Sequence, residues 1–216
     1  MTTERINDFI RSARPATPCL VLDVEAARTS YRALREALPG AAVYYAVKAN
    51  PEPALLEMLV GEGSGFDTAS PAEIQMALRA GAGPDRVSYG NTIKKERDVA
   101  EAFRAGVNLF AVDSEEEVAK VARAAPGASV YCRILTDGEG AEWPLSRKFG
   151  CDVSTAVKVA ASARDAGLVP VGVSFHVASQ QTDLSAWSRA VADAADVFRA
   201  SEGLGIHMDF LNMGGG

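Results

Sequence analysis

The chain alternates short apolar runs with longer amphipathic stretches, and this alternation constrains its fold more than any other feature. The apolar runs are rich in Val, Tyr, Phe and Ile, and Gly or Pro bounds most of them, as is typical of buried strands. We predict seven strands, at Ala42–Val47, Ser64–Phe66, Val87–Tyr89, Leu109–Val112, Ser129–Leu135, Pro170–Phe175 and Met208–Met213. Strands that alternate with helices predict an α/β fold with a parallel sheet, either doubly wound or closed into a barrel.

Capping signals mark the starts of two of the intervening helices. Ser70 is expected as an N-cap, because Pro71 follows at the first helical position and Glu73 lies three residues after the cap. Ser114 and Glu117 repeat this capping box. A further helix is predicted by apolar residues that recur at helical spacing, namely Trp187, Val191, Ala195 and Phe198.

The strand count sets an expectation for the architecture. An eight-stranded barrel needs one strand more than the seven predicted here, and the chain stops at Gly214-Gly215-Gly216, directly after the seventh. We therefore expect a (β/α)8 TIM-type barrel that is truncated after its seventh strand, in an incomplete chain. Residues 1–20 are expected to form an N-terminal segment and residues 21–216 the barrel.

Charge and cysteine content argue against several classes of function. The net charge is −6, whereas nucleic acid or an anionic membrane calls for a basic patch. No apolar run approaches the roughly 20 residues that span a bilayer, and the N-terminus lacks the apolar core of a signal peptide. Three distant cysteines, Cys19, Cys132 and Cys151, form neither a disulfide framework nor a zinc-ligand spacing. We expect a cytoplasmic protein with no metal, nucleic-acid or membrane partner.

Polar residues follow the predicted strands in succession. Active sites of such barrels lie at the C-terminal ends of the strands. The groups at those positions are Lys48, Asp67, Asn91, Asp113, Arg133, His176 and the Gly214–Gly216 run. A lysine can form a Schiff base with a carbonyl ligand, and a glycine loop offers backbone N–H groups to a phosphate. Pyridoxal phosphate meets both requirements, so we predict it as the cofactor.

Each of these residues also has a purely structural interpretation. Lys48 could be a solvated loop residue, although it closes an apolar run that directs it toward the barrel mouth. His176 could be a satisfied core histidine, and the three glycines a flexible terminus. Asp67 could simply end a strand, and Asp113 could cap a helix, as Glu73 does. Their joint placement at successive strand ends favours a site.

Six motifs follow one another along the chain, at Tyr45–Asn50, Phe66–Ser70 with Glu73-Ile74, Gly90–Lys95, Leu145–Gly150, Ser174–Gln180 and Gly214–Gly216. In this order they resemble the motifs of the fold-type III pyridoxal-phosphate-dependent decarboxylases, in the ornithine decarboxylase branch. The resemblance runs from about residue 17 to residue 216. It implies an alanine racemase-like barrel, with the family's C-terminal β-domain absent from this chain.

The resemblance also implies a role for each candidate. Lys48 would bind the cofactor covalently and exchange it for the substrate amine, and His176 would stack on the face of the pyridine ring. Ser179 and the Gly214–Gly216 backbone would bind the phosphate. The other pocket residues implied by the resemblance are Asp67 and Arg133, with Glu73 behind them.

The implied activity is decarboxylation of a basic amino acid, with L-ornithine to putrescine in polyamine biosynthesis favoured, by a homodimer. Lysine, diaminopimelate or arginine decarboxylase are alternatives, as is a non-catalytic pyridoxal-phosphate binder, whereas the motifs of a racemase do not match. The resemblance places the acidic partner of the ring nitrogen, a phosphate-binding tyrosine and a Cys–Asp pair contributed across the dimer beyond residue 216.

Ala178 departs from the family, which usually has glycine at this position of the motif. If the φ angle there is positive, the Cβ atom costs about 1–2 kcal/mol. If φ is negative, alanine is harmless. We expect a negative φ, and therefore less than about a threefold change in cofactor affinity on Ala178→Gly.

Overall fold

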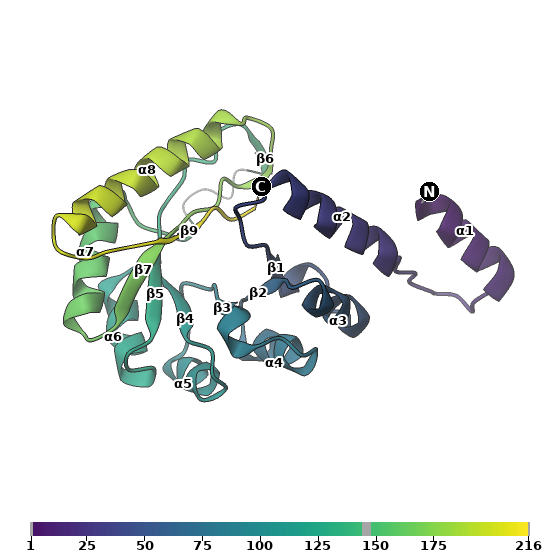
Figure 1. The fold of residues 1–216 in the computed structure, drawn as a ribbon, viewed down its shortest axis with the longest axis horizontal. Coiled ribbons are helices and arrows are strands. Elements are labelled where there is room, and N and C mark those ends of the chain that lie inside the picture. The colour runs from purple at the N-terminus through teal and green to yellow at the C-terminus, as the bar shows by residue number, and fades with distance from the viewer. Residues whose placement is uncertain (1, 144–147, 216) are drawn as a thin grey trace.

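A sheet of seven parallel strands forms the centre of the molecule. The computed structural model describes residues 2–143 and 148–215. The strands are β1 (Tyr44–Ala46), β2 (Gly65–Thr68), β3 (Val87–Tyr89), β4 (Leu109–Val112), β5 (Ser129–Arg133), β7 (Val169–Ser174) and β9 (Phe210–Asn212), hydrogen-bonded in that order. The sheet curls, and the helices that follow its strands cover its outer face (Figure 1). The predicted barrel architecture with seven strands is therefore confirmed, each strand lying within two residues of its predicted ends.

Helices connect the successive strands. The α-helices are α1 (Thr2–Ala13), α2 (Val24–Ala37), α3 (Pro53–Gly61), α4 (Pro71–Arg79), α5 (Glu96–Arg104), α6 (Glu115–Ala124), α7 (Val153–Asp165) and α8 (Ser185–Glu202), and two short 3-10 helices are η1 (Val47–Ala49) and η2 (Pro84–Arg86). Both predicted N-caps are confirmed, since Ser70 and Ser114 accept the backbone N–H groups of Glu73 and Glu117. The two glutamate carboxylates accept the N–H groups of Ala69 and Lys94 in place of the reciprocal bond of a capping box. No helix in the described part of the chain is long and apolar enough to span a membrane.

Helix α8 is present where it was predicted, but its buried face is turned by one residue. The residues that it buries are Ala186, Ala190, Ala194, Val197 and Ser201. Trp187 and Phe198 pack at the border of the core, while Val191 is exposed. The small side chains let the helix approach its neighbours closely, so the larger apolar residues are displaced to the edges of the contact.

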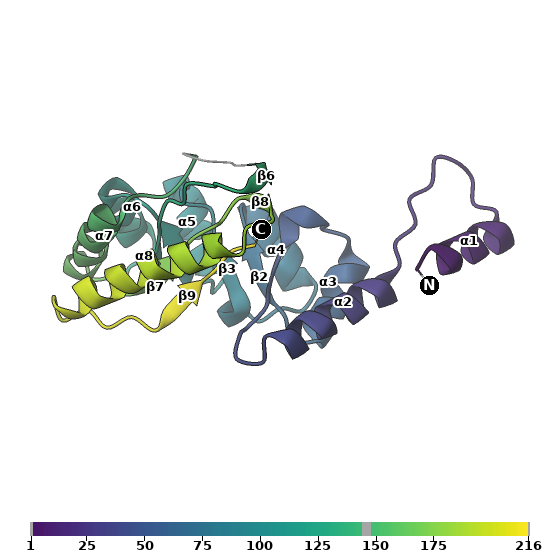
Figure 2. The same cartoon turned by 90° about the horizontal axis from the view of Figure 1, so that it is seen from above.

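Helix α1 lies apart from the sheet and its covering helices in both views (Figure 1 and Figure 2). Its Arg5 forms an ion pair with Asp23 at 3.2 Å, and the Asp23 side chain also caps α2 by accepting the N–H of Ala26. A division of the chain at residue 20 stays a prediction.

A two-stranded antiparallel ribbon, not predicted from the sequence, stands beside the main sheet. Its strands are β6 (Ala141–Trp143) and β8 (Ser179–Gln181), and they join the segment after β5 to the segment after β7. The ribbon was missed because its two short strands lack the apolar runs by which the others were recognised.

A buried ion pair fixes the loop between β3 and α5. The Lys94 amine lies 2.9 Å from the Glu117 carboxylate, and both side chains are nearly inaccessible to solvent. The amine also donates to the carbonyls of Asn91 and Ala111. Burial lowers the pKa of Lys94, while Glu117 opposes that shift. The pair thereby ties the loop that carries Asn91 to helix α6.

Candidate functional site

The C-terminal ends of the strands surround a cavity of about 380 Å³, a volume in the range of small-molecule sites. The predicted site residues that line it are Lys48, Asp67, Asn91, Arg133, His176, Gly214 and Gly215. Gly216 lies outside the described residues, as do the first three residues of the Leu145–Gly150 motif. Residues from six strands and their following loops are thus gathered at one mouth, as the barrel prediction requires.

Two candidates are placed elsewhere. Ser179 belongs to β8, where it pairs with Trp143, and it is not among the residues that line the cavity. Asp113 does not cap helix α6, because Ser114 does so. The Asp113 carboxylate instead accepts the backbone N–H of Gly150 at 2.9 Å. The interpretation of Asp113 as a helix cap was wrong, and its carboxylate positions the loop next to Phe149.

Lys48 projects from the end of β1 into this mouth. It lies in η1, directly after Val47, whose side chain is fully buried and anchors the turn. The Lys48 side chain is itself exposed. Its positive charge lowers the pKa of both Asp67 and His176. The amine is therefore accessible to a ligand in the cavity.

Asp67 lies in β2, at the side of the cavity. Burial raises the pKa of its carboxyl to about 6, although the positive charges of Lys48 and Arg133 oppose the shift. Gly90 makes room for this carboxylate, because a Cβ atom there would lie 2.0 Å from Asp67 Oδ1. Glu73 lies behind it and accepts the N–H of Ala69, a cavity residue, at 2.7 Å.

The raised pKa of Asp67 predicts how stability depends on pH in the cofactor-free protein. The carboxyl titrates near 3.8 without the fold and near 6 within it. Its contribution to stability is therefore present below pH 3.8 and is lost as the pH rises through 6. Asp67→Asn removes this titration, so the variant should gain about 1–3 kcal/mol relative to wild type between pH 4 and pH 7. Urea unfolding at both pH values measures the gain. Asp209→Asn, at an exposed position, is the control, and an equal change in both variants would contradict the assignment.

His176 presents a neutral ring to the cavity. Burial lowers the pKa of the imidazole, and the charges of Arg133 and Lys48 lower it further. Its Nδ1 atom accepts the backbone N–H of Ala178 at 3.0 Å, so the proton of the neutral ring resides on Nε2. Thr136 donates to the His176 carbonyl at 2.6 Å. The ring is thus held in one tautomer and one position.

Arg133, the last residue of β5, supplies a further positive charge to the cavity. Burial lowers the pKa of its guanidinium, and the nearby Asp113 and Asp67 carboxylates oppose that effect. The guanidinium lies 5.5 Å from the centre of the Phe149 ring. Tyr131, two residues earlier in β5, faces the same cavity and shares a 2.8 Å hydrogen bond with Ser88. Strand alternation could have identified Tyr131, because residues i and i+2 share a face.

The glycine loop approaches the histidine segment closely. Gly214 has φ of +67°, and a Cβ atom there would lie 2.4 Å from the carbonyl oxygen of Phe175. Its N–H donates to the Asn212 side chain at 2.9 Å. Nothing lies within 4 Å of a Cβ atom built at Gly215. Only glycine therefore fits at position 214, whereas Gly215 leaves open space at the cavity.

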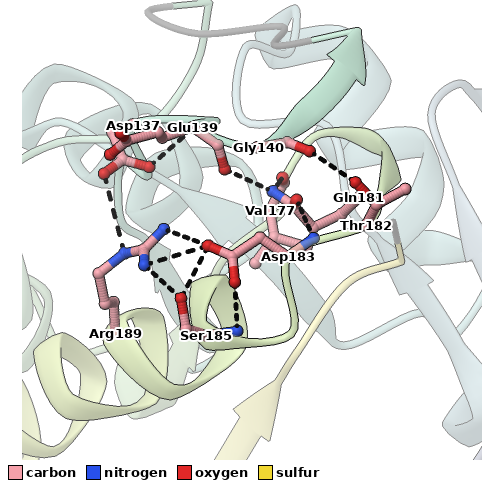
Figure 3. A network of polar contacts seen from close by, with 9 residues as sticks. All are labelled: Asp137, Glu139, Gly140, Val177, Gln181, Thr182, Asp183, Ser185 and Arg189. Carbon is pink, nitrogen blue, oxygen red and sulfur yellow. Dashed lines mark hydrogen bonds and ion pairs between the residues drawn. The ribbon is translucent and has the colours of Figure 1, made fainter.

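Side-chain hydrogen bonds fasten the segment after His176 to the segment after β5, as Figure 3 shows. The Gln181 amide donates to the carbonyls of Val177 and Glu139 and accepts the N–H of Asp183. Asp183 in turn accepts from Ser185 at the start of α8. The loop that follows His176 is therefore held by bonds within itself, to the segment after β5 and to the start of α8.

Ala178 lies in this loop with φ of +76°. The expectation of a negative φ was wrong, because the loop turns there in a conformation that favours glycine. The Ala178 side chain is buried, so the loop keeps this conformation despite the strain of the Cβ atom.

Ala178→Gly is therefore expected to stabilise the protein by about 1 kcal/mol, because it relieves the left-handed strain. Thermal or urea unfolding of the full-length protein measures the gain. Gly127→Ala is the matched control: φ there is +78° and the surrounding space is open, so it should cost a similar amount. If Ala178→Gly were destabilised, the positive φ of Ala178 would not be a source of strain.

The residues present fit pyridoxal phosphate. An accessible amine suits its aldehyde, a neutral imidazole suits its ring face, and a guanidinium with a closely packed glycine loop suits an anionic group. The fold and site together define a parallel α/β barrel whose cavity fits a carbonyl-bearing cofactor, with an accessible lysine at the end of its first strand.

Comparison with known proteins agrees with this class. Residues 24–216 match the family model described as pyridoxal-dependent decarboxylase, pyridoxal binding domain. The chain therefore belongs to the pyridoxal-dependent decarboxylase family, whose cofactor is pyridoxal phosphate, and provides its cofactor-binding domain.

Individual relatives extend the match over nearly the whole chain. A lysine/ornithine decarboxylase of Selenomonas ruminantium is 37% identical over 203 residues, which are 94% of this chain and 52% of that protein. A solved lysine decarboxylase from the same organism superposes with a TM-score of 0.91 at 34% identity, covering 100% of this chain and 56% of the other. The arginine decarboxylase of Paramecium bursaria Chlorella virus gives 0.93 at 26% identity, with 99% and 58% covered. The chain thus spans about half the length of these relatives.

Proposed function

We propose that the full protein decarboxylates a basic amino acid with pyridoxal phosphate, and that its preferred reaction converts L-ornithine to putrescine. The observation that supports this most directly is the exposed Lys48 amine at a cavity that also contains His176 and Arg133. These are the amine, the ring-facing group and the anion-binding charge that the reaction requires.

In this proposal Lys48, His176, Arg133 and the backbone at Gly215 have different roles. The cofactor, when bound, supplies the electron sink that makes loss of carbon dioxide feasible. Lys48 provides the amine that attaches to it and then makes way for the substrate amine. The neutral His176 ring covers one face of the site and excludes water from it. Arg133 and the backbone at Gly215 attract negative charge.

Related structures favour a basic substrate. A solved relative named SrLDC, 34% identical to this chain, contains cadaverine. The lysine/ornithine decarboxylase of Vibrio vulnificus has been solved with putrescine, and the viral arginine decarboxylase with agmatine. Each of these ligands is an amine formed when a basic amino acid loses its carboxylate. The Phe66–Ser70 and Asn91–Lys95 motifs favour the ornithine branch within this group. Lysine, arginine or diaminopimelate is the alternative substrate.

Because putrescine is a polyamine, the reaction would serve polyamine biosynthesis in the cytoplasm. The resemblance to ornithine decarboxylases supports a homodimer. A non-catalytic pyridoxal-phosphate binder of the same fold is the competing proposal, and retention of the amine, imidazole and glycine loop weighs against it.

The test is release of carbon dioxide by the full-length protein. The purified protein is saturated with pyridoxal phosphate and incubated with L-ornithine, L-lysine, L-arginine and meso-diaminopimelate, with D-ornithine as a control. We expect the highest kcat/KM for L-ornithine. A preference for another member of the panel would overturn the ornithine assignment, and cofactor binding without any release would support the non-catalytic binder.

A further inference from the structure

Two buried thiols touch behind the wall of the cavity. The Sγ atoms of Cys132 and Cys151 lie 3.5 Å apart, and neither cysteine is in a disulfide. Cys132 is the penultimate residue of β5 and precedes Arg133, while Cys151 follows Phe149 by two residues. Both thiols are directed at the same carbonyl oxygen, that of Arg133, at 3.9 Å and 3.7 Å.

The backbone holds these thiols in register. The Cys151 N–H donates to the Arg133 carbonyl at 3.0 Å, and the Cys151 carbonyl accepts from Leu135 at 2.9 Å. These bonds form a parallel bridge between Ile134 and Cys151. Gly150 packs so closely on β5 that a Cβ atom would lie 2.8 Å from the Ile134 backbone. The contact between the sulfur atoms is therefore imposed by the fold on both sides.

We propose that Cys132 and Cys151 form an oxidisable dithiol, and that its disulfide weakens the binding of pyridoxal phosphate. The oxidant is a peroxide. One thiol attacks the peroxide O–O bond and becomes a sulfenic acid, with release of water. The second thiol attacks that sulfur, its proton leaves with the sulfenic hydroxyl as a second water, and the S–S bond forms. Two thiols and one hydrogen peroxide thus give one disulfide and two waters.

The two cysteines have different parts in this reaction. Cys151 is 9% exposed and Cys132 only 3%, so the oxidant reaches Cys151 first. The hydrogen bond to Cys151 and burial both raise the pKa of Cys132. Cys132 is therefore the slower of the two to attack peroxide, and it reacts second, losing its proton as it attacks the sulfenic acid beside it.

Closing the disulfide has a consequence for the site. The sulfur atoms must move from 3.5 Å to a bond of about 2.05 Å. Cys132 and Cys151 lie diagonally across the parallel bridge at Ile134. The backbone hydrogen bonds of that bridge and the close packing of Gly150 leave the loop little room to move toward β5, so closing the S–S bond strains the loop. Phe149 lies on that loop and contacts the Arg133 guanidinium, so the strain reaches the cavity wall directly.

The test uses the full-length protein and two readouts that do not depend on turnover. The cofactor-free protein is treated with hydrogen peroxide, digested under non-reducing conditions, and searched by mass spectrometry for the linked Cys132 and Cys151 peptides. Binding of pyridoxal phosphate is then titrated by absorbance. We expect the linked peptide, and a Kd raised at least about threefold that dithiothreitol restores.

Variants separate this pair from other thiols. After peroxide treatment, Cys132→Ser and Cys151→Ser should each keep the Kd of the untreated protein. Two variants are used so that the test still stands if one of them folds poorly. Cys19→Ser, at an exposed position, is the matched control and should respond as wild type does. Absence of the linked peptide overturns the proposal, as does a linked protein with an unchanged Kd. Because neither readout requires decarboxylation, failure of the proposed function would be seen separately, as cofactor binding without carbon dioxide release.

Discussion

Lys48→Ala should abolish decarboxylation by the full-length protein, lowering kcat by at least about a thousandfold. The reason is chemical, since alanine has no amine to attach the cofactor or to make way for the substrate. The fold should persist, because the Lys48 side chain is exposed and contributes little to packing. The wild-type holoenzyme, reduced with borohydride, should carry the cofactor label on the peptide that contains Lys48.

Lys158→Ala is the matched control, because Lys158 is an exposed lysine on α7. It should keep the rate of wild type, and its reduced form should carry the label on the same peptide as wild type. Label on a different lysine, or turnover at the wild-type rate by Lys48→Ala, would refute the role of Lys48. Far-ultraviolet circular dichroism of both variants distinguishes loss of chemistry from loss of fold.

Gly214→Ala should destabilise the protein by about 2–5 kcal/mol and weaken cofactor binding. Left-handed strain contributes about 1–2 kcal/mol, and the clash of the Cβ atom with the Phe175 carbonyl adds about 1–3 kcal/mol. The backbone on both sides of this contact belongs to the site, since Gly214 and His176 both line the cavity. Relief of the clash would move one or both of them. Urea unfolding and titration with pyridoxal phosphate measure the two effects.

Gly215→Ala is the neighbouring control for stability. No atom lies within 4 Å of its Cβ position, and its φ angle is outside the left-handed range. Its free energy of unfolding should stay within about 0.5 kcal/mol of wild type. If both alanine variants lost the same free energy of unfolding, the close contact between Gly214 and Phe175 would not be the cause of the loss.

The arrangement of the barrel followed from its pattern of residues. Buried parallel strands produce continuous apolar runs, and each run such as Val87–Tyr89 or Leu109–Val112 was found at its predicted position. Because parallel strands end at a common edge, the order of polar residues at their ends also predicted that Lys48, Asp67 and His176 meet at one cavity.

Other features depend on contacts that a linear pattern does not contain. The positive φ of Ala178 is set by the closure of its loop, in which Gln181 and the ribbon strand β8 hold the chain. Asp113 has the spacing of a cap, yet its carboxylate reaches Gly150, which lies 37 residues away along the chain. The rotation of α8 arises in the same way, from the neighbours against which its alanines pack.

The order of the strands also bears on how the protein folds during synthesis. The strands of the main sheet lie side by side in the order in which they occur along the chain, from β1 to β9. Every new strand and helix can therefore dock as soon as it leaves the ribosome, and no early segment must wait for a distant partner to begin the ladder. The two ends of this order are the exceptions, because β1 and β9 each have one side without a strand partner among the described residues. The short strand Tyr44–Ala46 is made before β9, so its free side is open to pairing with another molecule for longer.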